Sequence, residues 1–297
     1  MVAITTLLAG LATVLAPALA AFSDPLACSG VCTDTHDPSL IRRSSDGKYF
    51  RFATGLSIHT APALTGPWTN AGNVLSGGSK INNPGSKGPW APDVSLVGNT
   101  YYLYYAVSSF GTQNSAIGLA TSTTMEAGSW TDHGSTGLQS KTGDPYNAID
   151  PNLIQVNGAN FLTFGSFWGD IYQTQLSSDA LTWTKAAPYN VELNKTASRS
   201  SEGSYVFAHG GYYYLFWSSK CRKQPQPARA TGYTLRLKLK LLDTDPSPLL
   251  QAVNAAATIL PSRRQARSTR SWSAAARATR DPSYGPLSPL IHNETFY

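Results

Sequence analysis

The chain has 297 residues, enough for one large domain or two modest ones with a real core. Charged residues are only 13% of the sequence and aromatic residues 11%, which excludes a charge-rich helical bundle, a coiled coil and a mostly disordered chain. The net charge of +6 comes from the tail, since residues 1–219 hold 10 Lys/Arg and 13 Asp/Glu while residues 220–297 hold 13 and 4. The body therefore has no basic surface for phosphates, and we expect no nucleic-acid partner.

Residues 1–20 predict a secretory signal peptide. Residues 2–20 are uncharged and apolar, and they end in the small-x-small sequence ALA that is typical of a cleavage site. A membrane anchor is the alternative, which the short length and the proline at position 17 disfavour. We expect a secreted, extracellular protein with no membrane partner.

The three cysteines suit an oxidising compartment. Cys28 and Cys32 are placed to close a small disulfide loop, which leaves Cys221 as a free thiol or as one that has lost its partner. A metal site is disfavoured because no second Cys/His pair stands at ligand spacing. Asn194 and Asn293 begin glycosylation sequons, which are compatible with a secreted glycoprotein but are weak evidence.

The body of the chain repeats itself about every 55 residues. Each repeat opens with an acidic residue and a short apolar run, then has a turn dipeptide and an aromatic strand, which together are typical of a β-hairpin. The four openings are HDPSLI with Asp37, APDVSLV with Asp93, IDPNLI with Asp150 and SEGSYVF with Glu202. The aromatic strands are predicted at 48–54, 100–107, 159–166 and 212–219. Three repeats continue into a weaker strand, at 56–62, 116–122 and 171–177, and end in a Trp-Thr step.

This pattern predicts an all-β protein of the β-propeller type, with each repeat forming one small sheet. A β-sandwich with coincidental repeats is the alternative, but it would not explain a recurring acidic opening. The innermost strand of a propeller blade runs along the central axis, so the acidic openings are expected to converge there. Like charges in one pocket raise each other's pKa, and an acid kept protonated beside an ionised one suits glycoside hydrolysis. A single Asp-Pro would more simply be a turn cap.

At these residues, the sequence resembles the fungal endo-1,5-α-L-arabinanases of glycoside hydrolase family 43. The resemblance rests on HDPSLI, WAPDVSLVGNTYYLYYAVSSFGTQNSAIGLATS, NAIDPNLI and SEGSYVF, and it covers roughly residues 25–220. It implies a five-bladed propeller that cuts internal arabinan bonds with inversion. We expect a monomer that needs no cofactor and has no metal among its site residues, although the resemblance allows a calcium ion in the channel.

The resemblance also implies roles for single residues. Asp37 is expected to be the general base that activates water, and Glu202 the general acid. Asp150 is expected to modulate the pKa of Glu202 and to orient the sugar, whereas Asp93 is expected to be structural. The expected substrate-binding residues are Trp90, Phe110, Asn147 and Ser166. Core packing between blades is the alternative for Trp90.

Beyond the fourth repeat the sequence departs from the family. We expect a signal peptide at 1–20, four readable blades in a catalytic region at 21–220, and an atypical basic tail at 221–297 in which the fifth blade is degenerate or missing. The tail is interpreted as a partner-binding arm, as disorder or as mistranslated sequence. His292 stands near a position where the family has a histidine, but its surroundings do not match.

Two alternative functions remain open. One is an exo-acting α-L-arabinofuranosidase or β-xylosidase with the same fold, since endo and exo action depend on loops that the sequence does not resolve. The other is a propeller that binds carbohydrate without catalysis. The set Asp37, Asp150 and Glu202 argues against this second alternative, because a lectin needs no acid–base pair.

Overall fold

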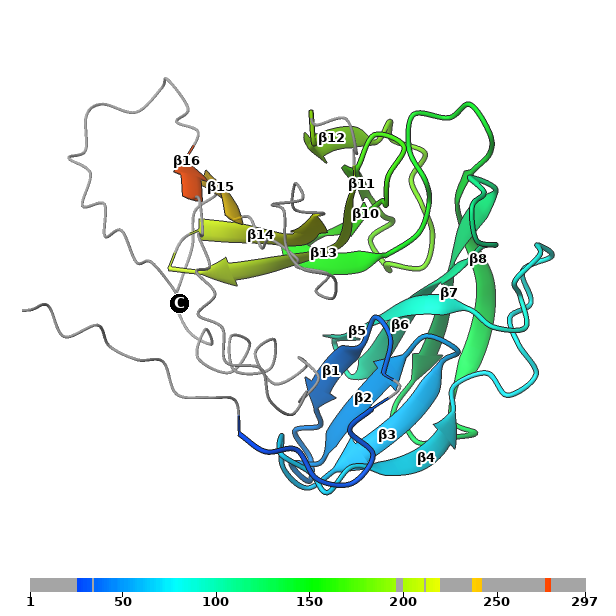
Figure 1. Cartoon of the computed structure of the whole chain (residues 1–297), viewed down its shortest axis with the longest axis vertical. Helices are drawn as coiled ribbons and strands as arrows, with labels where there is room; N and C mark the ends of the chain where they lie inside the picture. The colour runs from blue at the N-terminus through cyan, green and yellow to red at the C-terminus, as the bar shows by residue number, and fades with distance from the viewer. Residues whose placement is uncertain are drawn as a thin grey trace, which may run out of the picture.

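The protein is built from β-strands, as the computed structural model in Figure 1 shows. The structure describes residues 26–33, 35–195, 200–210 and 212–219, and the backbone of 237–241 and 276–278. In this part of the chain no helix is long and apolar enough to cross a membrane. The predicted signal peptide lies outside the described residues, as do Cys221, His292 and Asn293.

The strands form four sheets of four strands each, which we number as blades I to IV. Blade I contains β1 (Ser39–Arg42), β2 (Tyr49–Ala53), β3 (Ser57–Ala61) and β4 (Thr69–Asn73). Blade II contains β5 (Trp90–Val97), β6 (Thr100–Val107), β7 (Ser115–Ser122) and β8 (Thr131–Ser140). Blade III contains β9 (Asn152–Val156), β10 (Ala159–Phe164), β11 (Ile171–Gln175) and β12 (Tyr189–Glu192). Blade IV contains β13 (Ser201–His209), β14 (Tyr212–Ser219), β15 (Leu237–Leu241) and β16 (Ala276–Ala278).

The aromatic hairpins predicted from the sequence are confirmed. The predicted strands at 100–107 and 212–219 coincide with β6 and β14, and the other two aromatic strands lie in β2 and β10. Asn157 and Gly158 have φ angles of 49° and 78°, so this dipeptide makes the tight turn between β9 and β10. The third Trp-Thr step behaves differently, because Trp183 forms only an isolated bridge with Leu176 and β12 begins later, at Tyr189.

Blade IV takes its two outer strands from beyond residue 220. β15 pairs with β14 in the antiparallel sense, and β16 pairs with β15 in the parallel sense. The tail therefore contributes backbone to the fourth sheet. Among the described residues there is neither a fifth sheet nor a closed ring of blades. The blades instead follow one another around an open arc (Figure 1).

Aromatic and aliphatic side chains fill the space between successive blades. One cluster joins blades I and II and includes Phe50, Phe52 and Tyr105, all fully buried. A second joins blades II and III and includes Tyr104 and Phe164. A smaller third cluster, Ile171, Leu215 and Trp217, lies between blades III and IV. Each sheet buries apolar area only where a neighbour covers it, so packing between blades holds the arc together.

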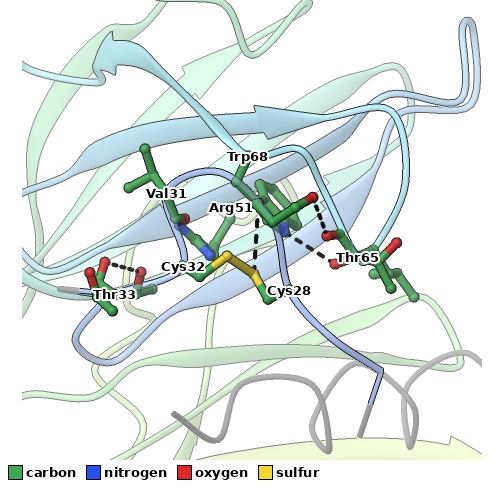
Figure 2. Close-up of a disulfide and its surroundings, with 10 residues drawn as sticks. Cys28, Val31, Cys32, Thr33, Arg51, Thr65 and Trp68 are labelled. Carbon is green, nitrogen blue, oxygen red and sulfur yellow. Dashed lines mark hydrogen bonds between the residues drawn. A yellow bond between two sulfur atoms is a disulfide. The ribbon is translucent and has the colours of Figure 1, made fainter. Parts of the chain in front are cut away.

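A disulfide loop attaches the N-terminal segment to blade I (Figure 2). The predicted bond between Cys28 and Cys32 is present. Inside the loop, the Val31 backbone N–H donates to the Trp68 carbonyl at 2.8 Å. The buried Arg51 guanidinium donates to the Val31 carbonyl at 2.7 Å and stacks over the Trp68 ring at 4.6 Å. This loop therefore fixes the chain shortly before it reaches Asp37.

The sequon at Asn194 does not suit a glycan in this fold. Asn194 is only 9% exposed, and its side-chain amide donates to the Ser219 hydroxyl at 3.2 Å. A glycan on this nitrogen would force the residue out of its buried position.

The close approach of two strands in blade II requires a glycine. Gly118 on β7 lies opposite Tyr105 on β6, and a Cβ at Gly118 would come within 2.3 Å of the Tyr105 ring. The Tyr105 hydroxyl donates to Asp132 at 2.6 Å, so the ring is not free to move away.

We predict that Gly118→Ala lowers the free energy of unfolding by about 1–3 kcal/mol, because the new methyl group overpacks the ring. Gly77→Ala is the matched control, since no atom lies within 4 Å of its Cβ, and a change below about 0.5 kcal/mol is expected there. Urea denaturation followed by tryptophan fluorescence measures both. Equal stability of the two variants would contradict the packing argument.

Candidate active site

Each inner strand has a kink in the backbone close to its start, and the candidate acids lie at or next to these kinks. The residue at the kink has a positive φ in every blade, namely Asp37 at 44°, Ala91 at 43°, Asp150 at 54° and Gly203 at 60°. In blades I, II and III a proline follows this residue. Non-glycine residues rarely adopt a positive φ, and such strain persists where the surrounding structure enforces it. The repeated kink is thus a fixed feature of the fold.

The structure corrects the sequence alignment of blade II. The strand registers pair Ser39 with Phe52, Asp93 with Tyr104 and Asn152 with Thr163. Asp93 is therefore equivalent to Ser39 and Asn152, and it lies two residues after the kink. The prediction that Asp93 opens its repeat in the same place as Asp37 and Asp150 is wrong, because Ala91 occupies that position. Aligning the repeats on the prolines instead of the acids would have given the correct register.

Asp93 and its equivalents connect each blade to the next. In each case the side chain accepts a hydrogen bond from a backbone N–H of the following inner strand. The pairs are Ser39 with Val94 at 3.1 Å, Asp93 with Leu153 at 2.9 Å and Asn152 with Val206 at 2.7 Å. Burial raises the pKa of Asp93 to about 6, although the bonds from Leu153 and Asn152 oppose the shift. These contacts support the structural role expected for Asp93.

The three candidate acids are close enough to influence one another. Burial raises the pKa of Asp150 to about 8, and the negative charges of Asp37 and Glu202 add to this shift. A backbone N–H donated by Gly203 at 3.0 Å acts in the opposite direction. Residues more than 50 positions apart in sequence, on β13 and before β1 and β9, are thus brought to one place. With a pKa of about 8, we expect Asp150 to be protonated at acid and neutral pH.

Asp37 and Glu202 lie in different surroundings. The Asp37 side chain is 51% exposed, and one of its oxygens lies 2.8 Å from His36 Nδ1. Glu202 is partly buried and accepts a hydrogen bond from the Ser166 hydroxyl at 3.0 Å. Ser166 itself is 4% exposed and follows β10. Water reaches Asp37 readily, whereas Glu202 is held by a neighbouring blade.

The other three predicted substrate-binding residues differ in their exposure and in their distance from a kink. Trp90 begins β5 and directly precedes the kink, as Glu202 does in blade IV, and it is partly exposed. Asn147 is 2% exposed, and its side-chain oxygen accepts a hydrogen bond from Ser115 at 2.7 Å. Phe110 is 96% exposed in the turn after β6. Of these three, Trp90 is the one that the repeat itself places beside a kink.

No group of three His, Cys, Asp or Glu side chains in the described ranges is arranged to hold a metal ion. Asp37, Asp150 and Glu202 are near enough to interact electrostatically, but they do not form such a group. Whether the channel takes up calcium stays a prediction.

The raised pKa of Asp150 has a consequence for stability. Between its ordinary value of 3.8 and about 8, the folded state binds more protons at Asp150 than the unfolded state, so this residue makes stability fall as pH rises. Asp150→Asn cannot ionise but keeps an oxygen for the Gly203 N–H.

We predict that Asp150→Asn melts at least about 2 °C above the unmodified protein at pH 8, with a smaller difference at pH 4. Thermal unfolding followed by circular dichroism measures this. Asp179→Asn is the control of opposite sign, because hydrogen bonds from Ser177 and Leu181 lower the pKa of Asp179. A difference for Asp150→Asn that does not vary with pH would contradict the electrostatic interpretation.

Comparison with known proteins supports a relationship over most of the chain. The arabinan endo-1,5-alpha-L-arabinosidase A of Aspergillus niger is 56% identical over 200 residues, which cover 67% of this chain and 62% of that protein. The probable arabinan endo-1,5-alpha-L-arabinosidase A of Aspergillus clavatus is 52% identical over 221 residues, covering 73% and 68%. The match thus spans about two thirds of these relatives.

Two solved structures share the fold. A GH43 endo-arabinanase from Bacillus licheniformis has a TM-score of 0.63 at 31% identity, covering 72% of this chain and 74% of that one. An exo-1,5-alpha-L-arabinanase from a bovine ruminal metagenomic library has a TM-score of 0.60 at 32% identity, covering 71% and 73%. The family model for glycosyl hydrolases family 43 matches residues 31–270 and so extends beyond residue 220. The chain belongs to glycosyl hydrolases family 43.

Proposed function

We propose that the protein is a secreted glycoside hydrolase that cuts internal α-1,5-L-arabinofuranosidic bonds of plant arabinan with inversion. The observation that carries the proposal is the hydrogen bond at 3.0 Å from the Gly203 N–H, which directly follows Glu202, to the Asp150 carboxylate. The raised pKa of Asp150, to which the charges of Asp37 and Glu202 contribute, supports it. Relatives that are 52% and 56% identical in sequence are named arabinan endo-1,5-alpha-L-arabinosidases, which supports arabinan as the proposed substrate.

The surroundings of the acids suit a division of labour. Asp37 is half-exposed, as a base that takes a proton from a water molecule must be. Glu202 is partly buried on another blade, where it donates a proton to the oxygen of the leaving sugar. Inverting enzymes hold the two groups roughly 6.5–9.5 Å apart so that water fits between them, and a position on separate blades is compatible with such a gap.

Asp150 is assigned neither the base role of Asp37 nor the acid role of Glu202. With its pKa raised to about 8, it is neutral at acid and neutral pH and adds no negative charge to the site. A neutral carboxyl group donates a hydrogen bond as well as accepting the one from Gly203. We assign it the orientation of the sugar and the control of charge at Glu202. Trp90, Phe110, Asn147 and Ser166 complete the proposed contacts with substrate.

Exo action is the second candidate, because one structural neighbour of similar TM-score is named an exo-1,5-alpha-L-arabinanase. The two modes differ in whether one end of the cleft is blocked, and the catalytic groups are the same. A non-catalytic binding protein is a weaker candidate, since binding alone does not require three interacting carboxyl groups.

We predict that Glu202→Gln and Asp37→Asn each lower kcat on linear arabinan by about 10²–10⁴-fold, because each removes a proton-transfer group while keeping its shape. Reducing-sugar release measures the rate, and circular dichroism checks that the fold is intact. Asp179→Asn, a change to an exposed carboxylate in a turn of blade III, is the control that retains activity. Turnover within twofold of the unmodified protein in either site variant would refute the assignment.

We predict that the viscosity of an arabinan solution falls well before reducing sugar accumulates, because cuts inside a chain shorten it fastest. Viscometry and a reducing-sugar assay on the same sample provide the comparison. Release of single sugars or one short oligosaccharide from the start, with viscosity falling only in proportion, would favour exo action instead.

A further inference from the structure

A strained segment follows β10 in blade III. Phe167, Trp168, Gly169 and Asp170 all have a positive φ, at 53°, 34°, 95° and 65°. Three of these four residues are not glycine, so the segment holds a conformation that its side chains disfavour. Such strain persists only where surrounding contacts over-determine it, and it is concentrated at functional sites. The contacts that hold this segment therefore indicate what it does.

Those contacts converge on the two residues that begin β13. The Phe167 N–H donates to the Ser201 carbonyl at 3.1 Å, and the Ser201 N–H donates to the Asp170 carboxylate at 3.1 Å. The Ser166 hydroxyl donates to the Glu202 carboxylate at 3.0 Å. These hydrogen bonds involve both backbone polar groups of Ser201 and the side chain of Glu202.

Asp170 is the anchor of this arrangement. Its residue is 0% exposed, and its second carboxylate oxygen accepts the Asn194 N–H at 2.7 Å. A buried carboxylate that accepts backbone N–H groups is costly to disturb, because each donor loses its partner. At its other end the segment is tied to the neighbourhood of Asp150, since the Gly165 N–H donates to the Ile149 carbonyl at 2.8 Å.

We propose that Asp170 is a positioning residue for Glu202: it holds the Ser166–Asp170 segment against β13 so that the Glu202 carboxyl group points at the leaving-group oxygen. The inference rests on the proposed function, in which Glu202 is the general acid. Asp170 does not touch the substrate in this account. It acts through Ser201 and Ser166.

The test separates positioning of an acid from general damage to the protein. Hydrolysis of arabinan needs a proton on the departing alcohol. In an arabinotrioside with a 2-chloro-4-nitrophenyl group, the leaving group departs as a stable phenolate and does not need that proton. Loss of acid positioning therefore lowers kcat on arabinan more than kcat on the aryl substrate. Loss of folded protein lowers both equally.

For Asp170→Asn in the full chain, we expect kcat on linear arabinan to fall at least about tenfold, with kcat on the aryl arabinotrioside within about twofold of the unmodified protein. Asp132→Asn is the matched control. Asp132 is also a buried carboxylate, it accepts backbone N–H groups from Lys80 and Gly134, and it lies on β8, the outermost strand of blade II. Its replacement is expected to lower the melting temperature while leaving the ratio of the two kcat values unchanged.

Ser166→Ala provides a second variant if Asp170→Asn does not fold, and the same selective loss on arabinan is expected from it. Equal loss on both substrates, or no loss on arabinan, would overturn the positioning role. Failure of the unmodified protein to hydrolyse either substrate would instead overturn the proposed function, so the two failures are distinguishable.

Discussion

The fold depends on one repeated interaction, in which a polar side chain on the inner strand of blades I, II and III accepts a backbone N–H from the inner strand of the next blade. Ser39, Asp93 and Asn152 perform this role at equivalent positions. Apolar packing holds neighbouring sheets together, but it is non-directional and permits sliding. These hydrogen bonds set the offset between neighbouring inner strands, and the kinks two residues earlier are thereby brought to the same level. The grouping of the acids follows from this alignment.

The grouping has an electrostatic cost that the protein accommodates through protonation. Burial disfavours the ionised form of Asp150, and the charges of Asp37 and Glu202 add to this effect, so the pKa of Asp150 is raised to about 8. The same principle acts at Asp93, whose burial also raises its pKa. At Asp93, however, the hydrogen bonds are inter-blade contacts, so the group supports the scaffold. An aspartate near the start of an inner strand thus serves structure or chemistry according to its distance from the kink.

Much of the fold was predictable from the sequence, because turn dipeptides and aromatic strands are local signals. The hairpins around Asn157-Gly158 and before Tyr212 required no knowledge of tertiary structure. The register of Asp93 was not predictable from its acidity, because the sequence does not distinguish an aspartate with a structural role from one in a candidate active site. The prolines after the kinks carried the correct alignment. The outer strands of blade IV were not predicted. The LKLKL sequence of β15 does alternate apolar and charged residues, but it lacks the acidic opening and the aromatic strand that mark the repeats, and β16 has only three residues.

The site was predictable as a set of acids but not as an arrangement. Sequence spacing placed Asp37, Asp150 and Glu202 in the first, third and fourth repeats, and the electrostatic influence on Asp150 agrees with their convergence. The role of Ser166 was anticipated only as a hydrogen-bonding group. Asp170 carried no signal, because its importance comes from a backbone N–H on another blade.

Direct titration of Asp150 tests the central claim that three carboxyl groups from separate blades share one pocket. Carbon-13 NMR of selectively labelled aspartate, assigned with Asp150→Asn, reports the pKa of this carboxyl group in the full chain. We predict that the pKa of Asp150 is raised well above 3.8, toward about 8, and that it falls when Asp37→Asn or Glu202→Gln removes a neighbouring charge. An Asp150 that titrates at its ordinary value and does not respond to either substitution would contradict the account.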